Sequence, residues 1–446
     1  MTTLKYFIVV PLLSLSITIL VGCKSGLIQD LETLEQNHTP YSKSIKSPQK
    51  RHIPKSIHKI IDQNYNKRFF SPWKLKRHHF QKKDIMWAFT RFKKQSGYGE
   101  NKKKLPKNWI APIEKEANLS TFPNFTQPAI TIKNTNLRLL PTKKPHFTHF
   151  KHNGEGFPFD NLQNSTIAAG VPVIITHITK RKDWVFVISP FAKGWIQVYD
   201  IAYAGPKFRK SYLSHKKFIA ITKENIPLLS KRNQFLFDSN IGMIFPKIKR
   251  IKNHFLVSVP QTTSKRFAFS EKVLISIKNA RTKPVPLTTK NISNIANELL
   301  NQPYGWGGSF HNRDCSAMIQ DMFVPFGILL PRNSKAQAHK GGIYFDLSKL
   351  SPEKKEDLII KNSIPYLTLV WLPGHIMLYI GQNDDKAIVF HNIWGLRTKD
   401  ELGRKIIGKS VITTLDPGKD LRNADPNGSL IKRVEGITLL VPRYHL

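Results

Sequence analysis

The sequence predicts an α+β unit in about the last two-fifths of the chain, preceded by two small β-barrels and a helical segment. The α+β unit is predicted because a helix-period run follows Asp314 and Cys315, and three strand-like runs come after it. The barrels are predicted from short alternating runs separated by turn residues between about 128 and 262. The 446 residues, 40% of them hydrophobic, are enough for several cores.

Residues 1–22 have the features of an export signal. Lys5 precedes an apolar run that ends at Val21, and this run is too short, with the wrong flanks, for a membrane span. The Val-Gly-Cys sequence ending at Cys23 resembles the bacterial lipoprotein signal, which implies lipidation of Cys23. Lys24 after that cysteine implies the outer membrane in the same resemblance. An ordinary signal peptide and a true anchor helix are the alternatives.

The charge balance indicates a polyanionic environment. Lysine and arginine number 70 against 30 acidic residues, which gives a formal net charge of +40. Nucleic acid, an anionic envelope polymer and acidic lipid headgroups all fit such a charge. Because an exported protein has little opportunity to meet chromosomal DNA, we expect no nucleic-acid partner.

The stretch before the barrels divides by composition. Residues 23–66 are polar with few aromatics and predict a flexible tether. Residues 67–127 predict a helical stabilising segment, in which the run from Asp84 to Lys94 reads as an amphipathic helix. Its basic residues either form a solvated face or bind an anion.

The predicted barrels occupy residues 128–206 and 207–265. In the first, the runs 171–178 and 183–202 supply three strands, two of them around an Ala-Lys-Gly turn. In the second barrel, the runs 217–230 and 253–261 show the same pattern of short strand-like segments separated by turn residues. The barrels either contribute to function or serve only as structural packing.

The catalytic unit is predicted at residues 266–446. A helix over 291–303 precedes a glycine-containing loop and the Cys315 helix, which ends near Pro325. A polar insertion of about 25 residues then leads to strand candidates at 364–371, 373–381 and 386–395.

Cys315 is the candidate nucleophile. With Cys23 assigned to the lipid, it has no disulfide partner in an export compartment, so the thiol is flagged as reactive. Asp314 can cap the helix that Cys315 begins, and the helix N-terminus is expected to lower the thiol pKa. The alternative is a small buried cysteine at a helix start.

His375 and His391 are the candidate base and orienting residue. They lie on neighbouring predicted strands, so pairing of these strands can place the rings together beside Cys315. For the oxyanion, the Cys315 N–H and the Tyr304 phenol are candidate donors, although Tyr304 can instead simply pack beside Trp306. Metal-ligand spacing is absent from the sequence, and no cofactor is expected.

Several motifs resemble those of the NlpC-type cell-wall cysteine peptidases, a papain-like family that hydrolyses peptidoglycan stem peptides. They are YGWGG, RDCSAM, LPRNS, LPGHIMLYIG and VFHNIWG in the catalytic unit. Upstream, GYGEN, NLRLLPT and DWVFVISPFAKGWIQVYDIA resemble the stabilising segment and the bacterial SH3-like domains of a lipoprotein subgroup. The resemblance covers most of the mature chain.

The resemblance implies a nucleophile at Cys315, a base at His375, a third polar residue at His391 and a motif tyrosine at Tyr304. Asp314 and Ser316 match the family's substrate-contacting residues, and Trp306 in the same loop is a further candidate for substrate contact. Ala317 replaces the family's usual glycine, which predicts a slightly tighter cleft.

The implied substrate is the bond between γ-D-glutamate and meso-diaminopimelate in stem peptides or released muropeptides. In the subgroup, the first barrel closes one end of the cleft and an acidic group reads the free amine of an N-terminal L-alanine. Asp314, together with Glu155 or Asp160 from the barrel, is the candidate for that role. An amidase or acyltransferase on the same scaffold is an alternative, as is a lipid-anchored peptidoglycan-binding module with weak or no catalysis.

Overall fold

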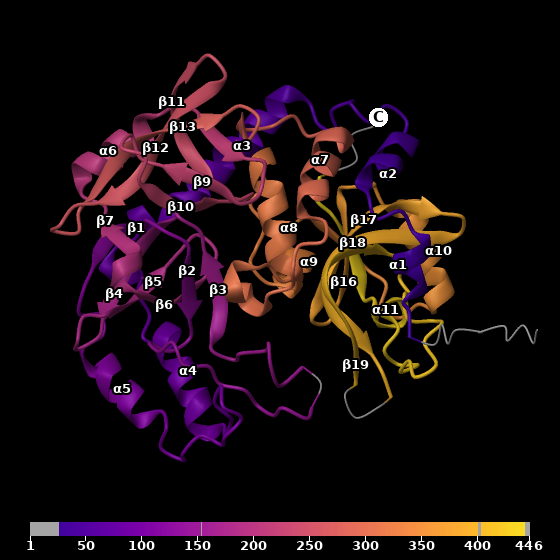
Figure 1. The fold of residues 1–446 in the computed structure, drawn as a ribbon, viewed down its shortest axis with the longest axis horizontal. Helices are drawn as coiled ribbons and strands as arrows, with labels where there is room; N and C mark the ends of the chain where they lie inside the picture. Colours follow the sequence, from indigo (N-terminus) through magenta and orange to yellow (C-terminus); the bar gives the residue numbers. More distant parts are fainter. Residues whose placement is uncertain (1–25, 153, 400–402, 442–446) are drawn as a thin grey trace, which may run out of the picture.

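The computed structural model describes residues 26–152, 154–399 and 403–441. Two β-rich units stand on one side of the molecule, the nucleophile helix α8 (Cys315–Phe323) lies at the centre, and the catalytic sheet lies on the other side (Figure 1). The predicted signal and Cys23 fall outside the described residues. Within the described ranges, no helix has the length and apolar character needed to cross a bilayer.

The prediction of a flexible tether over 23–66 is wrong for its described part. Residues 26–66 contain α1 (Gln29–Thr33), α2 (His38–Ser44) and most of α3 (Lys55–Phe69). These helices attach to the catalytic unit through long-range bonds. One Asp30 oxygen accepts from both the N–H and the hydroxyl of Thr414 at 2.7 Å, and the His38 N–H donates to Asn297 at 2.8 Å. The polar composition was misread because these groups find partners far along the chain.

The helical segment after α3 follows the prediction more closely. The amphipathic helix is α4 (Lys83–Lys94), and Ile85, Phe89 and Phe92 on one face are buried. A second helix, α5 (Ala111–Ala117), packs on the same cluster of side chains. Together they cover the outer side of the first barrel.

The first barrel is a seven-stranded sheet in the order β3-β2-β6-β5-β4-β1-β7. Its strands are β1 (Gln127–Thr131), β2 (Thr135–Arg138), β3 (Gln163–Ile167), β4 (Pro172–Ile178), β5 (Trp184–Ile188), β6 (Lys193–Gln197) and β7 (Ile201–Tyr203). The hairpin turn falls at Ser189–Ala192, where Ser189 N–H bonds the Ala192 carbonyl at 2.9 Å, slightly before the predicted Ala-Lys-Gly turn.

The second barrel ends later than predicted. Helix α6 (Pro206–Ser214) precedes a five-stranded sheet in the order β13-β12-β11-β8-β14 and a separate β9–β10 pair. The strands are β8 (Phe218–Ile221), β9 (Ile226–Leu229), β10 (Phe235–Ser239), β11 (Ile244–Ile251), β12 (His254–Thr262), β13 (Ala268–Ser276) and β14 (Ala280–Thr282). The boundary is therefore after Thr282 rather than 265, because β13 pairs with β12 along its whole length and β14 pairs with β8.

The catalytic unit packs helices on a six-stranded sheet in the order β15-β20-β16-β17-β18-β19. Its helices are α7 (Thr289–Leu299), α8, α9 (Ser334–Lys340), α10 (Pro352–Asn362) and α11 (Leu430–Arg433). Its strands are β15 (Ile343–Asp346), β16 (Thr368–Leu372), β17 (His375–Asn383), β18 (Lys386–Arg397), β19 (Arg404–Thr413) and β20 (Gly436–Leu439). The polar insertion thus supplies β15 and α10.

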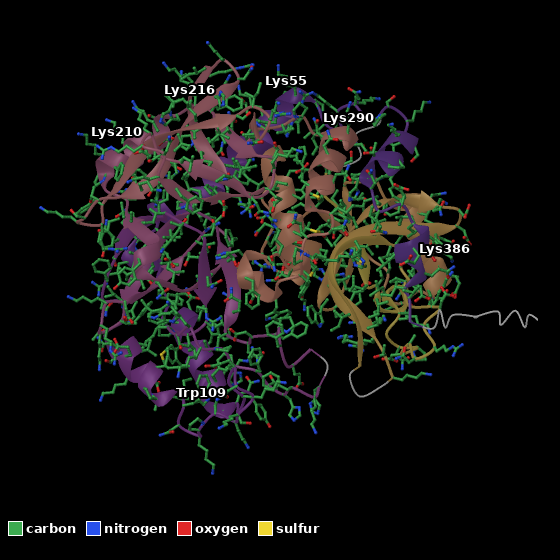
Figure 2. All side chains as sticks on the ribbon, in the orientation of Figure 1. Lys55, Trp109, Lys210, Lys216, Lys290 and Lys386 are labelled. Carbon is green, nitrogen blue, oxygen red and sulfur yellow. The ribbon has the colours of Figure 1, made fainter. Side chains whose placement is uncertain are left out.

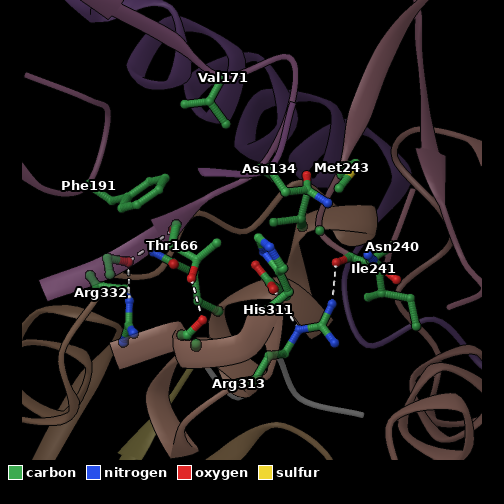
Figure 3. Close-up of a pocket in the computed structure, with 18 of the residues that line it drawn as sticks. Asn134, Thr166, Val171, Phe191, Asn240, Ile241, Met243, His311, Arg313 and Arg332 are labelled. Atoms are coloured by element: carbon green, nitrogen blue, oxygen red, sulfur yellow. Dashed lines mark hydrogen bonds and ion pairs between the residues drawn. The ribbon is translucent and has the colours of Figure 1, made fainter. Parts of the chain in front are cut away.

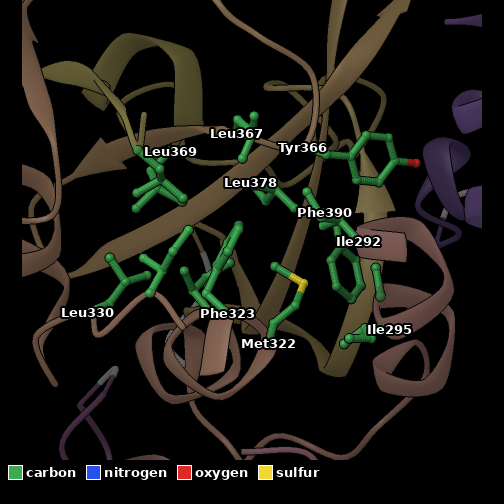
Figure 4. Close-up of a cluster of buried hydrophobic side chains, with 14 of the residues drawn as sticks. Ile292, Ile295, Met322, Phe323, Leu330, Tyr366, Leu367, Leu369, Leu378 and Phe390 are labelled. Atoms are coloured by element: carbon green, nitrogen blue, oxygen red, sulfur yellow. The ribbon is translucent and has the colours of Figure 1, made fainter. Parts of the chain in front are cut away.

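The core between α8 and the sheet fixes the position of the nucleophile helix. Met322 and Phe323 of α8 pack against Leu378 of β17 and Phe390 of β18 (Figure 4). Burying each such side chain stabilises the fold by about 2 kcal/mol. Met377 lies on the opposite face of β17 from Leu378, in a second cluster.

Candidate active site

Helix α8 begins at Cys315 and is capped by Asp314, as the sequence predicts. The Asp314 Oδ1 atom accepts the N–H of Ala317 at 2.8 Å and the hydroxyl of Ser316 at 3.0 Å. The cap holds Cys315 at the first helical position, where its backbone N–H is not used by the helix. That N–H is therefore available to an oxyanion.

Arg332 from the LPRNS motif holds the cap in place. Its guanidinium donates to both carboxylate oxygens of Asp314 and to the Ser316 hydroxyl at 2.9 Å. Burial raises the pKa of Asp314, but the Arg332 charge and the hydrogen bonds outweigh it, so the net pKa is lowered. Asp314 is thus a buried, ionised carboxylate directly before the thiol.

The thiol of Cys315 is buried, and the backbone N–H of Ile376 hydrogen bonds to its sulfur. Ile376 follows His375, so α8 and the start of β17 meet at the nucleophile. Burial, and then the charge of Asp314, raise the pKa of Cys315 to about 12. The expected lowering is therefore wrong, because the residue that caps the helix also places a negative charge beside the sulfur.

His375 and His391 are brought together as predicted. Nε2 of His375 lies 2.8 Å from Nδ1 of His391, and Nε2 of His391 lies 3.1 Å from the Thr413 hydroxyl. That hydroxyl donates to the Thr414 carbonyl at 2.7 Å, so it accepts from His391. His391 then carries its proton on Nε2 and accepts from Nε2–H of His375. The Nδ1 atom of His375 keeps its lone pair, and no described residue hydrogen bonds to it.

Both imidazoles are neutral in the resting site. Burial, followed by the Arg433 charge, lowers the pKa of His375 to about 4, and burial lowers the pKa of His391 well below its ordinary value. A neutral thiol therefore lies where α8 meets the strand that carries a neutral base. This arrangement favours deprotonation of the thiol during attack rather than a stored thiolate.

Tyr304 and Trp306 lie in the same loop but contact different partners. Burial, and then the charges of Cys315 and Asp314, raise the pKa of Tyr304 well above its usual value, so its phenol stays protonated and can donate. The ring of Tyr304 packs 5.9 Å from Trp394, not on Trp306. Trp306 instead packs 5.1 Å from Phe159 and donates Nε1–H to the Asp160 carbonyl at 3.2 Å.

The first barrel touches this loop through glycines. Gly308 has φ of +86°, and a Cβ there would lie 2.0 Å from the Thr166 hydroxyl, which donates to the Gly308 carbonyl at 2.7 Å. Gln163 donates to the Gly307 carbonyl at 3.1 Å in the same way. Strand β3 thus packs on the backbone of the YGWGG motif.

A cavity of about 90 Å³ lies where both barrels meet α8 (Figure 3). Thr166 and Met243 line it from the barrels, and Ala317 lines it from α8. The extra methyl group of Ala317 therefore faces this cavity. Arg313, which precedes Asp314, binds Glu224 of the second barrel at 2.8 Å and Asp321 of α8 at 2.7 Å.

Glu155 and Asp160 have different environments. The Asp160 carboxylate accepts from Arg138 at 2.6 Å and from the His146 and Leu162 N–H groups, so it is held inside the barrel and the proposal that it reads an amine is a poor fit. Glu155 is half exposed and lies 3.4 Å from His152. Of the two, only Glu155 has a carboxylate that faces solvent.

Three residues of the site were not predicted: Arg332, Thr413 and Arg313. Arg332 belongs to the LPRNS motif and Arg313 to the RDCSAM motif. The signal that could have identified them was their charge, in motifs close to the nucleophile. Thr413 carried no signal, because its role depends on the pairing of His391 with Val411 in β18 and β19.

The fold and site define a hydrolase with a thiol on a capped helix and two imidazoles on an antiparallel sheet. Residues 301–392 match the NlpC/P60 family, so the chain carries an NlpC/P60 domain of the cell-wall cysteine peptidase type. Residues 12–122 match the N-terminal NLPC_P60 stabilising domain, 145–197 an SH3 domain of the SH3b1 type and 207–251 one of the SH3b2 type. The stabilising match begins ahead of the predicted segment and includes the helices that replaced the tether.

One solved structure shares this fold over nearly the whole chain. A novel NlpC/P60 endopeptidase from Photobacterium damselae subsp. piscicida is 24% identical with a TM-score of 0.81, over 91% of this chain and 97% of its own. An NlpC/P60 family protein from Bacillus cereus ATCC 10987 is 16% identical with a TM-score of 0.49, over 71% and 100% of the two chains. No curated protein sequence matches the chain.

Proposed function

We propose that the protein cleaves the bond between γ-D-glutamate and meso-diaminopimelate in peptidoglycan stem peptides, with Cys315 as nucleophile. The observation that carries this proposal is the hydrogen-bonded series from His375 through His391 to Thr413, which begins one residue before the N–H that meets the thiol. A series of this kind gives His375 one defined free ring nitrogen.

The proposed reaction has two halves. In the first, the sulfur attacks the γ-glutamyl carbonyl while Nδ1 of His375 takes the thiol proton. The Cys315 N–H and the Tyr304 phenol donate to the oxyanion. The imidazolium then gives its proton to the leaving amine, and the C–N bond breaks to leave a thioester. In the second half, His375 takes a proton from a water molecule, which attacks the thioester. The C–S bond then breaks, and His375 returns the proton to the sulfur.

The acyl side of the substrate is proposed to lie between α8 and the first barrel. Asp314, Ser316 and Trp306 stand there together, and Trp306 is tied to the barrel. A free L-alanine amine is proposed to face this acidic side, with Glu155 as the more exposed carboxylate. Because Arg332 already balances Asp314, a second acid is needed for a net attraction.

The cleavage is tested with the tripeptide L-alanyl-γ-D-glutamyl-meso-diaminopimelate. We expect the protein to release the L-Ala-γ-D-Glu dipeptide and the C315A variant to release none, as measured by mass spectrometry. Equal release from both proteins would remove the mechanism. Release of a different fragment would indicate an amidase or acyltransferase instead.

The preference for a free alanine is tested with the N-acetylated tripeptide. Acetylation removes the positive charge, so kcat/KM should fall by about tenfold if a carboxylate reads the amine. The variant E155Q should lose that difference if Glu155 is the reader. Equal rates on both peptides would reject the preference while leaving cleavage intact.

A second candidate function, peptidoglycan binding, is favoured by the charge of the second barrel. Residues 207–282 contain 17 lysines and arginines and three acidic residues, and Lys210 and Lys216 point outward there (Figure 2). If binding is the main function, C315A should sediment with isolated cell walls as well as the unaltered protein does. Loss of sedimentation in 0.5 M salt would identify the charge as the cause.

The location at the outer membrane is proposed from the lipoprotein-like sequence that ends at Cys23. Metabolic labelling with a fatty-acid analogue should mark the protein but not the C23A variant, and the label should fractionate with outer membranes. Labelling of C23A would reject the anchor.

A further inference from the structure

Three arginines from different elements of the catalytic unit converge at the edge of the active site. Arg397 is the last residue of β18, and Arg404 is the first residue of β19. The two residues are directly paired between these antiparallel strands. Arg433 ends α11, and its Nη2 donates to the Pro373 carbonyl at 3.2 Å. Pro373 lies two residues before His375, so this guanidinium is fixed beside the strand that carries the base.

The three charges act on one another. Arg397 and Arg433 both lower the pKa of Arg404 after burial, and Arg397 does the same for Arg433. Asp425 is the acidic residue that opposes them in both cases. None of the three arginines forms an ion pair with a carboxylate of the residues that the structure describes.

This grouping costs free energy without an anion. Arg404 and Arg433 are half-buried, where like charges repel each other more strongly than on an open surface, and Arg397 is exposed beside them. Arg397 and Arg404 stand directly opposite each other in the ladder, where like charges destabilise a sheet. A guanidinium presents two parallel N–H groups that match a carboxylate, so a bound carboxylate would convert the repulsion into hydrogen bonds.

The position of the cluster relates it to one side of the scissile bond. The Arg433 charge acts on His375, and the Arg404 charge acts on Tyr304. Because the imidazole must protonate the departing amine, the residue that carries that amine lies on the His375 side. Next to the cluster is a cavity of about 330 Å³ whose lining includes Arg397, Lys419 and Asp425.

We propose that Arg397, Arg404 and Arg433 bind a carboxylate of the diamino acid on the leaving side of the scissile bond. This inference rests on the proposed cleavage of γ-D-glutamyl stem peptides. meso-Diaminopimelate carries a carboxylate at its distal end, and L-lysine has the same chain without it. The arginines would thus distinguish these two residues.

The test compares two tripeptides, one ending in meso-diaminopimelate and one in L-lysine, on the same proteins. We expect the unaltered protein to favour the first by roughly tenfold in kcat/KM. The variants R404Q and R433Q should lose that preference, and the readout is the ratio of kcat/KM for the two peptides rather than either rate alone, because both arginines also act on His375 or Tyr304. The control R422Q changes an exposed arginine outside the cluster and should keep the preference.

Three outcomes have different meanings. Equal rates on both peptides for the unaltered protein, or an unchanged preference in R404Q and R433Q, would overturn the arginine site and leave the cleavage in place. Failure to cleave either peptide would reject the proposed function. In that case binding of the two uncleaved peptides to C315A still decides the site, because only the diaminopimelate peptide should bind more weakly when R404Q is added.

Discussion

Arg332 binds both carboxylate oxygens of Asp314, with N–O distances of 3.0 Å and 2.7 Å. The Nε atom of the same guanidinium donates to the Ser165 hydroxyl of the first barrel at 2.7 Å. One side chain therefore connects the residue before the nucleophile to strand β3 of the first barrel. The barrel is part of the active-site structure rather than an appended module.

Replacing Arg332 by lysine should separate charge from geometry. A lysine keeps the positive charge but cannot bond both oxygens of Asp314 and Ser165 together. We expect kcat/KM on the tripeptide to fall by about tenfold to a hundredfold, with a small change in the thermal midpoint.

The control is S165A, which removes only the contact with the barrel and should cost less activity than R332K. If R332K retained full activity, the fixed position of Asp314 would not matter for catalysis.

Replacing Asp314 by asparagine should increase the reactivity of the thiol while reducing hydrolysis. Asparagine still caps the helix, so α8 should start at the same residue. The negative charge that raises the pKa of Cys315 is removed, so the pKa should fall and the thiolate fraction at a given pH should rise.

The rate of Cys315 alkylation against pH measures this effect. We expect the D314N profile to shift toward lower pH, while S316A, which leaves the charge in place, should not shift it in that way. Slower alkylation of D314N at every pH would contradict the assigned role of the charge.

Replacing Thr413 by valine should affect the chemical step. Valine has nearly the same shape but no oxygen to accept the Nε2–H of His391, so the ring orientation is no longer fixed. We expect kcat to fall by about tenfold to a hundredfold while KM changes little.

Serine at position 413 keeps the hydroxyl and should restore most of kcat. A drop in kcat that serine fails to restore would point to packing around the methyl group rather than to the hydrogen bond.

The parts of the fold that follow from local pattern were predictable from the sequence. The strand candidate at 373–381 corresponds to β17, and its alternation puts Met377 and Leu378 in two different clusters of side chains. The cap at Asp314 and the pairing of His375 with His391 followed from the same reasoning. These features depend on neighbours in sequence or on one hairpin.

The features that failed depend on distant partners. The tether was misjudged because Asp30 bonds Thr414 and His38 bonds Asn297, and no local pattern reports such pairs. The thiol pKa was misjudged because helix position was weighed without burial and without the charge of the cap itself. The second barrel was cut short because β14 pairs with β8, a strand about 60 residues earlier.

Lys283 links the N-terminal helices to the catalytic unit and should make stability depend on pH. Its side chain is 1% exposed, its amine binds Asp62 of α3 and lies 3.8 Å from the Tyr65 ring centroid. Burial lowers its pKa from 10.5 to about 8, although Asp62 raises it in part.

The sign of the effect follows from the folded pKa lying below the unfolded one. Between pH 8 and 10.5 the unfolded chain binds more protons at Lys283 than the folded chain, so this residue adds stability as pH rises through that window. The gain should be on the order of 3 kcal/mol when complete.

In K283M the denaturation midpoint should lack this increase, while K290M, an exposed lysine, should behave like the unaltered protein. At pH 7, K283M leaves the half-buried Asp62 carboxylate without its ion-pair partner and should be less stable by about 3 kcal/mol, and adding D62L should recover most of that loss. A midpoint for the unaltered protein that falls over this window as steeply as that of K283M would show that Lys283 carries no depressed pKa in the folded chain.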